Sequence, residues 1–314
     1  MGCSHPAERL AIVKGTEMTT QQSDEARLTP SDQSVVELDE SKINQRVIEV
    51  IDAMADAIEG VMRKLNVTYA EYELFRQMNM TLGGYNMAGI WDVWIVPMLN
   101  QIHHGDWKGT SENPDGPFYI PGAPVLDAPY SLFRHPDEPG EALIVSGQVR
   151  TPDGVGLAGA VLDLWQCNAF GFYSNFGMTE DMEEWDFRGR VPADDEGRFS
   201  FRTIKPPPYT SLLALEDPVV AEDFFAALGR SKYRPAHIHV AIDHPALANR
   251  YITQLYFGDD PYIDYDVGAA VKPDLVSSPV HHDQAEEIEA SGLGRPFYSV
   301  DFDFVLPTGE RVEV

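Results

Sequence analysis

Residues 234–240 read RPAHIHV, a short run in which two histidines alternate with apolar residues after a proline. The apolar character continues to Ile242, which predicts a β-strand over His237–Ile242. Because successive side chains of a strand point to opposite faces, His237 and His239 share one face, about 6–7 Å apart at their Cα atoms. This spacing lets both imidazoles meet one metal ion, although two histidines hydrogen-bonded in a core would show the same pattern.

From residue 105 to the C-terminus the sequence contains further short apolar runs of the same kind. Glycine and proline interrupt short apolar runs about every 8 to 12 residues, a spacing that is typical of an all-β sandwich or barrel. The last run alternates apolar and polar residues most regularly and predicts a strand with one buried face. Besides His237–Ile242, strands are expected at Ala142–Val149, Ala160–Trp165, Arg198–Thr203, Ile252–Phe257 and Tyr298–Leu306, with a short helix at Ala221–Arg230.

The N-terminal third has a different pattern. Residues 1–40 are polar and aperiodic, which predicts a mobile arm. Apolar residues then recur at three- and four-residue steps over Ile43–Leu65, as on one face of a helix. Thr68 and Glu71 have the spacing of a capping box at the start of a second helix, and a third apolar segment covers Met87–Ile102. The sequence therefore predicts a mainly β protein, with an arm at 1–40, a helical N-terminal unit at 41–104 and a β-sandwich at 105–314.

Composition limits the classes of partner. The chain has 314 residues, of which 43% are hydrophobic and 23% charged, as in ordinary globular proteins. Its 23 Lys and Arg against 50 Asp and Glu give a net charge of −27, which disfavours nucleic acid and anionic membranes as partners. The chain shows no run of about 18 apolar residues and no apolar signal segment at its start, so we expect a cytoplasmic protein. Its two cysteines, Cys3 and Cys167, provide neither a disulfide framework nor a thiolate metal cage.

Two kinds of ligand could complete a metal site around the histidines. A carboxylate from Asp243 or Glu222 would give the two-His, one-carboxylate arrangement of Fe(II) oxygenases. A phenolate could instead come from Tyr173, which follows a strand and a glycine turn, or from Tyr209, which follows three prolines that stiffen the chain. A tyrosine at the end of a strand is also common in ordinary cores. The residues alone therefore leave open a metalloenzyme of either kind or a non-enzymatic binding module with an incidental histidine pair.

Several separate blocks of the sequence resemble the intradiol ring-cleaving dioxygenases, in particular their catechol and hydroxyquinol 1,2-dioxygenase branch. The resemblance covers roughly residues 41–280, including the helical unit, which the protocatechuate branch lacks. The blocks are DGPFYIPGAP at 115–124, GAVLDLWQCNAFGFYS at 159–174, DDEGRFSFRTIKPPPY at 194–209, RPAHIHV at 234–240 and YITQLYFGDDPY at 251–262.

The resemblance implies a ferric ion held by Tyr173, Tyr209, His237 and His239. This ligand set agrees with the chemistry of Fe(III), a hard cation that favours anionic oxygen. A phenol with a pKa near 10 must lose its proton to bind, so metal binding and tyrosine deprotonation are coupled. In the family the tyrosine at the position of Tyr209 leaves the iron and takes a proton from the diol substrate. The expected reaction is ring cleavage of a catechol-type substrate with O2 to a cis,cis-muconate-type diacid.

The resemblance assigns further roles around this site. Arg234 would stabilise negative charge on the substrate ring, and Gln254 would lie beside the iron ligands or the oxygen-binding position. Without the resemblance, Arg234 would read as a surface ion pair and Gln254 as an amide at a strand edge. Pro117 and Phe118 correspond to walls of the substrate pocket. The apolar face of the helical unit would form a homodimer interface.

Two features concern the substrate. The acidic loop GMTEDMEEWDFRG at 177–189 has no counterpart that we recognise in the family. Phe118 slightly favours hydroxyquinol, but one wall residue provides only about 1–3 kcal/mol of discrimination. Catechol, hydroxyquinol and halogenated catechols therefore all remain as expected substrates.

Overall fold

The computed structural model describes residues 44–72, 109–113, 115–135, 137–179, 182–210, 231–247, 250–266 and 270–309. They belong to two compact units, with the boundary after Asn66. The expected arm at 1–40, the apolar segment Met87–Ile102 and the expected helix at Ala221–Arg230 lie outside these residues.

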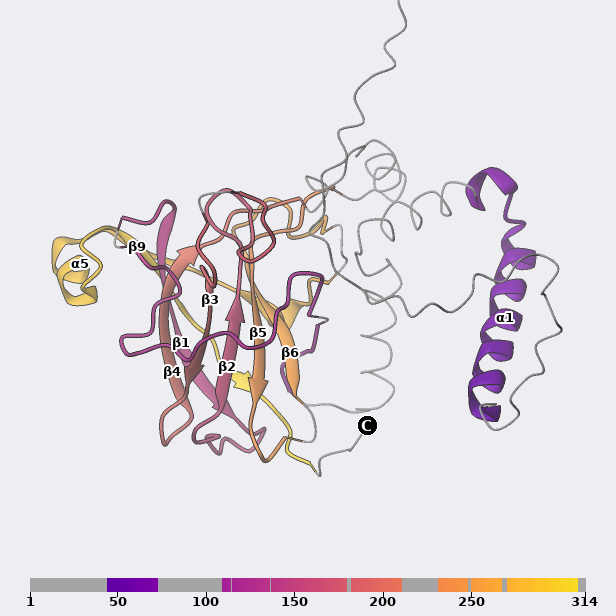
Figure 1. Ribbon diagram of the computed structural model, residues 1–314, viewed down its shortest axis with the longest axis horizontal. Coiled ribbons are helices and arrows are strands. Elements are labelled where there is room, and N and C mark those ends of the chain that lie inside the picture. Colours follow the sequence, from indigo (N-terminus) through magenta and orange to yellow (C-terminus); the bar gives the residue numbers. More distant parts are fainter. Residues whose placement is uncertain are drawn as a thin grey trace, which may run out of the picture. The chain divides into compact units, whose positions relative to one another are not determined.

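The first unit contains the helix α1, Gln45–Leu65, which confirms the helix that the apolar periodicity predicts (Figure 1). Asn44 caps its start, because the side-chain oxygen accepts hydrogen bonds from the main-chain N–H groups of Arg46 (3.0 Å) and Val47 (3.3 Å). Asn66 ends it in the left-handed conformation, with φ of 50°. None of the helix residues is buried. The dimer expected through its apolar face stays a prediction.

The expected capping box follows directly after α1. The main-chain N–H of Thr68 donates to Glu71 Oε2 at 2.8 Å, and the N–H of Glu71 donates to Thr68 Oγ1 at 3.3 Å. This reciprocal pair satisfies two N–H groups at the start of the next helical turn. No helix in the described parts of the chain is both long and apolar enough to cross a membrane.

The second unit is a β-sandwich of two five-stranded sheets (Figure 1). In one sheet β1 lies between β4 on one side and the β9–β10 segment on the other, with β8 beyond β9. The other sheet has the order β3-β2-β5-β6-β7. The strands are β1 (Glu141–Arg150), β2 (Val161–Trp165), β3 (Arg188–Pro192), β4 (Arg198–Lys205), β5 (His237–Asp243), β6 (Tyr251–Phe257), β7 (Val276–Ser277), β8 (Val280–His282), β9 (Phe297–Asp301) and β10 (Phe304–Val305).

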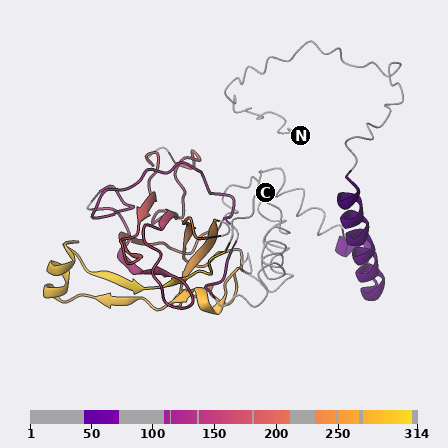
Figure 2. The same cartoon turned by 90° about the horizontal axis from the view of Figure 1, so that it is seen from below.

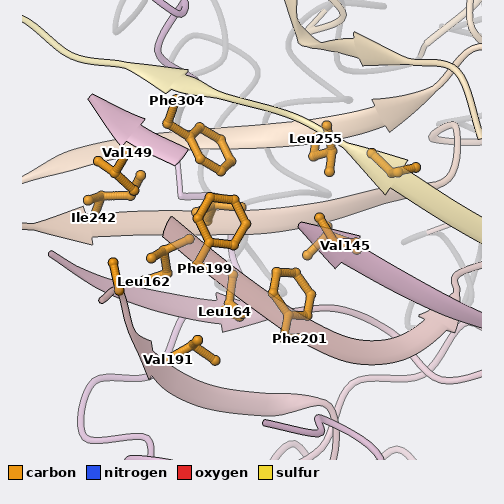
Figure 3. Packing of buried hydrophobic residues seen from close by; sticks show 14 of the residues in the cluster. Val145, Val149, Leu162, Leu164, Val191, Phe199, Phe201, Ile242, Leu255 and Phe304 are labelled. Carbon is orange, nitrogen blue, oxygen red and sulfur yellow. The ribbon is translucent and has the colours of Figure 1, made fainter. Parts of the chain in front are cut away.

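The facing sides of the two sheets form the hydrophobic core (Figure 3). Alternate residues of each strand point into it, as the period-two pattern requires. Each large apolar side chain buried there contributes about 1.5–3 kcal/mol of transfer free energy. Core residues include Val145, Val149, Leu162, Leu164, Val191, Phe199, Phe201, Ile242, Leu255 and Phe304.

Two short helical segments lie near the sheets. The 3-10 helix η4, Pro273–Leu275, precedes β7. The helix α5, Ala285–Ser291, lies at the tip of the hairpin that β8 and β9 form, and this hairpin extends beyond the sandwich (Figure 2).

The predicted strands at β1, β2, β4, β5 and β6 are confirmed, whereas the predicted C-terminal strand is divided. β9 ends at Asp301, and β10 starts again at Phe304. Between them the carboxylate of Asp303, rather than a main-chain carbonyl, accepts the N–H of Gln148 at 2.9 Å. The same carboxylate pairs with Arg150. This side-chain acceptor interrupts the ladder, which the alternation of apolar residues could not reveal.

β3 was missed by the sequence pattern. The acidic loop expected at 177–189 ends two residues earlier than predicted, since Arg188 and Gly189 begin this strand. Its sequence RGRVP contains few strand-forming residues, and it is ordered by pairing with β2.

Candidate metal centre

The two faces of β5 carry different chemistry. Ile238, Val240 and Ile242 point into the core between the sheets. His237 and His239 alternate with them and lie on the opposite, outer face of the sheet, where both are 1% exposed. Their ring centroids are 4.7 Å apart. The strand therefore places both histidines on one face, as expected.

Tyr173 reaches this outer face from the loop that follows β2. Asn168 shapes the loop, because its side-chain oxygen accepts the N–H groups of Phe170 (2.9 Å) and Phe172 (3.0 Å). Gly171 between them has φ of 85°, a conformation that favours glycine. A Cβ at that position would lie 3.0 Å from the Cβ of Tyr209. The glycine turn thus lets the two tyrosine segments approach each other.

Tyr209 reaches the same place from the end of β4, after the prolines at 206–208. Its main chain is paired with that of Arg234: the N–H of Tyr209 donates to Arg234 O at 3.1 Å, and the N–H of Arg234 donates to Tyr209 O at 2.8 Å. This bridge holds Tyr209 against the residues that lead into β5.

The four polar groups converge on one position. His237 Nε2 lies 3.1 Å from His239 Nε2, and the hydroxyl of Tyr173 lies 3.3 Å from that of Tyr209. The Tyr209 and His237 ring centroids are 5.4 Å apart, and those of Tyr173 and His239 are 6.3 Å apart. All four side chains are buried. The predicted ligand residues are thus neighbours in space although they come from three separate segments.

The protonation of these groups suits a metal site. Burial, together with the nearby Arg234 guanidinium, lowers the pKa of His237 to about 3. Burial and His237 lower the pKa of His239 well below its usual value. Both imidazoles are therefore neutral near pH 7, as metal binding requires. Burial also raises the pKa of Tyr209 to about 12 and raises that of Tyr173 well above its usual value, so neither phenol ionises near neutrality without a cation.

The hydrogen bonds of the histidines also fit a metal ion. The carbonyl of Pro235 lies 2.7 Å from His237 Nδ1, so this nitrogen carries the proton and the Nε2 lone pair faces His239. His239 Nδ1 is buried and has no hydrogen-bond partner among the described residues. A cation between the two Nε2 atoms and the two phenol oxygens would use donor atoms that otherwise face one another. The residues present therefore fit a hard trivalent cation.

Arg234 is held beside this centre by several acceptors. Its Nη2 donates to Gln254 Oε1 and to the Tyr256 hydroxyl, both at 2.8 Å. Its Nε forms an ion pair of 3.2 Å with Asp266. Burial opposes the charge of Arg234, but Asp266 raises its pKa well above the usual value, so the guanidinium stays protonated. Its Nη1 lies 3.4 Å from His237 Nε2, which places the charge beside the candidate ligands.

The two predicted wall residues differ in their surroundings. Phe118 is 8% exposed, and its ring stacks on Tyr173 with centroids 4.4 Å apart. Pro117 is exposed. The structure thus brings Phe118, Arg234 and Gln254 to the four ligand candidates, whereas Pro117 faces outward.

Residues that the sequence patterns did not select also contact the centre. Trp165 stacks on His239 with centroids 4.7 Å apart and an interplanar angle of 10°. Arg188 lies behind Tyr173, and Asp266 and Tyr256 hold Arg234. The strand register could have indicated Trp165, since it is the cross-strand partner of His239.

The carboxylate alternative receives no support from the described residues. Asp243 lies at the far end of β5, where it is exposed and forms an ion pair of 3.3 Å with Arg250. Glu222 lies outside the described residues. No group of three or more His, Cys, Asp or Glu side chains among the described residues is placed to hold a metal ion.

The chain matches one protein family and several known proteins. The family described as Dioxygenase matches residues 114–308. The chain is 35% identical to chlorocatechol 1,2-dioxygenase of Rhodococcus opacus over 271 residues, which are 84% of this chain and 98% of the relative. It is 34% identical to hydroxyquinol 1,2-dioxygenase of a Rhizobium species over 220 residues, 68% of this chain and 71% of the relative.

A solved structure shows the same likeness in three dimensions. The crystal structure of 3-chlorocatechol 1,2-dioxygenase from Rhodococcus opacus 1CP superposes with a TM-score of 0.68 and 30% identity, covering 84% of this chain and 99% of the other. The family match spans most of the β-sandwich and the residues of the candidate centre. On these grounds the chain belongs to the intradiol ring-cleaving dioxygenases.

Proposed function

We propose that the protein is a non-haem Fe(III) enzyme that cleaves the ring of a catechol-type diol with O2 and releases a cis,cis-muconate-type diacid. The observation that carries this proposal is the convergence of two buried phenols and two neutral imidazoles on one position. The similarity to chlorocatechol, catechol and hydroxyquinol 1,2-dioxygenases supports the substrate class.

Tyr173, Tyr209, His237 and His239 would hold the ferric ion. When bound, this ion would supply the Lewis acidity that ionises the diol and activates its ring toward O2. Of the two phenols, Tyr209 is the one that the resemblance to the family assigns to proton transfer with the diol. Its hydroxyl oxygen would then hold a proton taken from the diol.

The remaining residues orient the ring and stabilise its charge. The Arg234 guanidinium, fixed by Asp266 and Gln254, stabilises negative charge that develops on the ring in a buried environment. Gln254 lies opposite His239 in the sheet, so its amide borders the same position. Phe118 limits the space over Tyr173 and thereby the size of ring substituents.

The test compares two buried tyrosines. Tyr173→Phe should abolish the visible tyrosinate-to-iron absorption band of the iron-loaded protein together with ring cleavage, measured as O2 uptake with catechol and with hydroxyquinol. Tyr251→Phe is the matched control, because the Tyr251 hydroxyl donates to the carbonyls of Thr110 and Ser111, away from the centre. Full colour and turnover in Tyr173→Phe would refute the ligand assignment. A wild-type protein that binds no iron would refute the function.

A further inference from the structure

Arg188 is a buried arginine outside the residues assigned so far. It is the first residue of β3 and is 2% exposed. It pairs across the sheet with Trp165, whose partner on the other side is His239, and His239 pairs in turn with Gln254. β3, β2, β5 and β6 are successive strands of one sheet (Figure 1), and the cross-strand pairs place these four residues in one row across them. Arg188 therefore shares a sheet face with the candidate centre.

The guanidinium of Arg188 uses its three nitrogens on two segments of chain. Nη1 donates to the carbonyl of Phe118 at 2.8 Å. Nε donates to Ser174 Oγ at 3.0 Å, and Nη2 donates to Ser174 O at 3.2 Å. The Ser174 hydroxyl in turn donates to Asp186 O at 2.7 Å, which fixes its lone pairs toward Arg188. One side chain thus joins the Phe118 segment to the loop that carries Tyr173.

The rings that these segments carry are packed together. Phe118 stacks on Tyr173 at an interplanar angle of 15°, and Phe176 contacts Phe118 edge-on with centroids 5.4 Å apart. The Cζ atom of Arg188 lies 5.8 Å from the Tyr173 ring centroid and 5.6 Å from that of Phe176. The cation therefore lies against the ring cluster that surrounds one of the metal ligands.

The position is costly for a charged group. In the described part of the chain the guanidinium donates to neutral oxygens, and no carboxylate forms an ion pair with it. Burial lowers the pKa of Arg188 to about 10, which leaves it protonated near pH 7. A neutral side chain would avoid the cost of burying a charge. The rigid fork of arginine, by contrast, can reach three acceptors on two segments at once.

We propose that Arg188 is a positioning residue that clamps the Phe118 segment onto the Tyr173 loop, and so fixes the direction of the Tyr173 phenol and the depth of the Phe118 wall. This inference rests on the proposed ferric site, because Tyr173 is one of its ligands. Without the clamp the two rings separate, the phenol oxygen moves relative to the histidines, and the wall over the substrate loosens.

The experiment uses two substitutions and a control on the same strand. Arg188→Met removes all three donors, and Arg188→Lys keeps the charge with one nitrogen. Arg190→Met is the control, because Arg190 Nε donates to Ala123 O at 2.6 Å. Arg190 therefore contacts the segment that carries Phe118, but at a position away from the packed rings. The readouts are the position and intensity of the visible absorption band, the affinity for iron, and the melting temperature of the iron-free protein.

We expect Arg188→Met to shift and weaken the band and to lower iron affinity about 10- to 100-fold, as is usual for outer-shell partners of metal ligands. Arg188→Lys should fall between this variant and the wild type, and Arg190→Met should keep the wild-type band. If Arg188→Met does not fold, Ser174→Ala, which removes one of the three acceptors, should show a smaller shift of the same sign.

Two results would overturn the inference, and they can be told apart. If the wild type shows the band and a folded Arg188→Met or Ser174→Ala variant shows it unchanged, Arg188 does not position Tyr173 and the proposed function stands. If iron-loaded wild type has no such band, the ferric tyrosinate site itself is wrong and the inference fails with it.

Discussion

Replacing Asp266 by asparagine keeps the shape of the side chain and removes its charge. The side chains of Arg234 and Asp266 are 13% and 3% exposed, and they meet at 3.2 Å between Nε and Oδ1. Removing one partner of a buried ion pair costs about 3–5 kcal/mol, because the other charge stays buried. The amide oxygen of asparagine can still accept one hydrogen bond, and Gln254 Oε1 and the Tyr256 hydroxyl remain as acceptors. We therefore expect a loss near the lower end, about 3 kcal/mol.

An ion pair with one exposed partner, at the end of β5, provides the control. Asp243 is 51% exposed and lies 3.3 Å from Arg250 Nε, so Asp243→Asn should cost less than about 1 kcal/mol. The assay is urea unfolding of the iron-free protein followed by circular dichroism, since this separates folding from metal binding. Turnover of the iron-loaded Asp266→Asn variant should also fall further than its iron content, because Arg234 loses its anchor. Equal losses of stability in the two variants would refute the reasoning from burial.

Two further predictions concern Glu112 and the Gly171 turn. Burial raises the pKa of Glu112 to about 7 against the opposing effect of Lys272. Between about pH 4.5 and 7 the folded state therefore keeps a proton that the unfolded chain releases. The free energy of unfolding falls by about 3 kcal/mol as the pH rises through this range, and Glu112→Gln should abolish this fall. Identical pH profiles of urea unfolding for both proteins would contradict it. Gly171→Ala should lower the melting temperature and weaken the visible iron absorption band, because the added Cβ would press on Tyr209. Gly154 has a similar φ of 87° but open space around it, so Gly154→Ala should show only backbone strain of about 1–2 kcal/mol. Equal effects of the two alanines would rule out the contact with Tyr209.

The parts of the fold that the sequence predicted are those where a local pattern carries the information. β5 could be recognised because its alternation separates core residues such as Ile238 and Val240 from His237 and His239. α1 could be recognised from its apolar periodicity. β3 has no such signal, since the run RGRVP becomes a strand only when β2 is available to pair with it.

The two tyrosines show a different limit. Nothing in the spacing of Tyr173 and Tyr209 places them together; their local context suggested either one as a phenolate ligand, and the resemblance to the family selected both. In the structure they meet because Gly171 leaves room for Tyr209 and because Tyr209 is bridged to Arg234. Such contacts join loops that are distant along the chain, and local sequence patterns contain no information on them.

Asp266 and Arg188 were missed for the same physical reason. Asp266 lies in an acidic, turn-rich segment, and in a chain with 50 acidic residues its sequence gives no sign that it is buried against an arginine. Arg188 closes a run dense in acidic residues, where an arginine is expected to be exposed and ion-paired. Both become recognisable only when the tertiary structure shows what each charge faces.

The strand register links these observations. Once β2 is paired with β5 so that Trp165 lies opposite His239, the neighbouring pairs place Arg188 and Gln254 in the same row. A slip of one residue in either pairing would turn the affected side chains to the opposite face of the sheet. The core prevents this slip, because it would also carry Leu164 and Val240 out of the hydrophobic interior. The packing between the two sheets therefore fixes the row of residues on the outer face. In this way the hydrophobic core sets the geometry of the candidate centre, although none of the four ligand candidates belongs to the core.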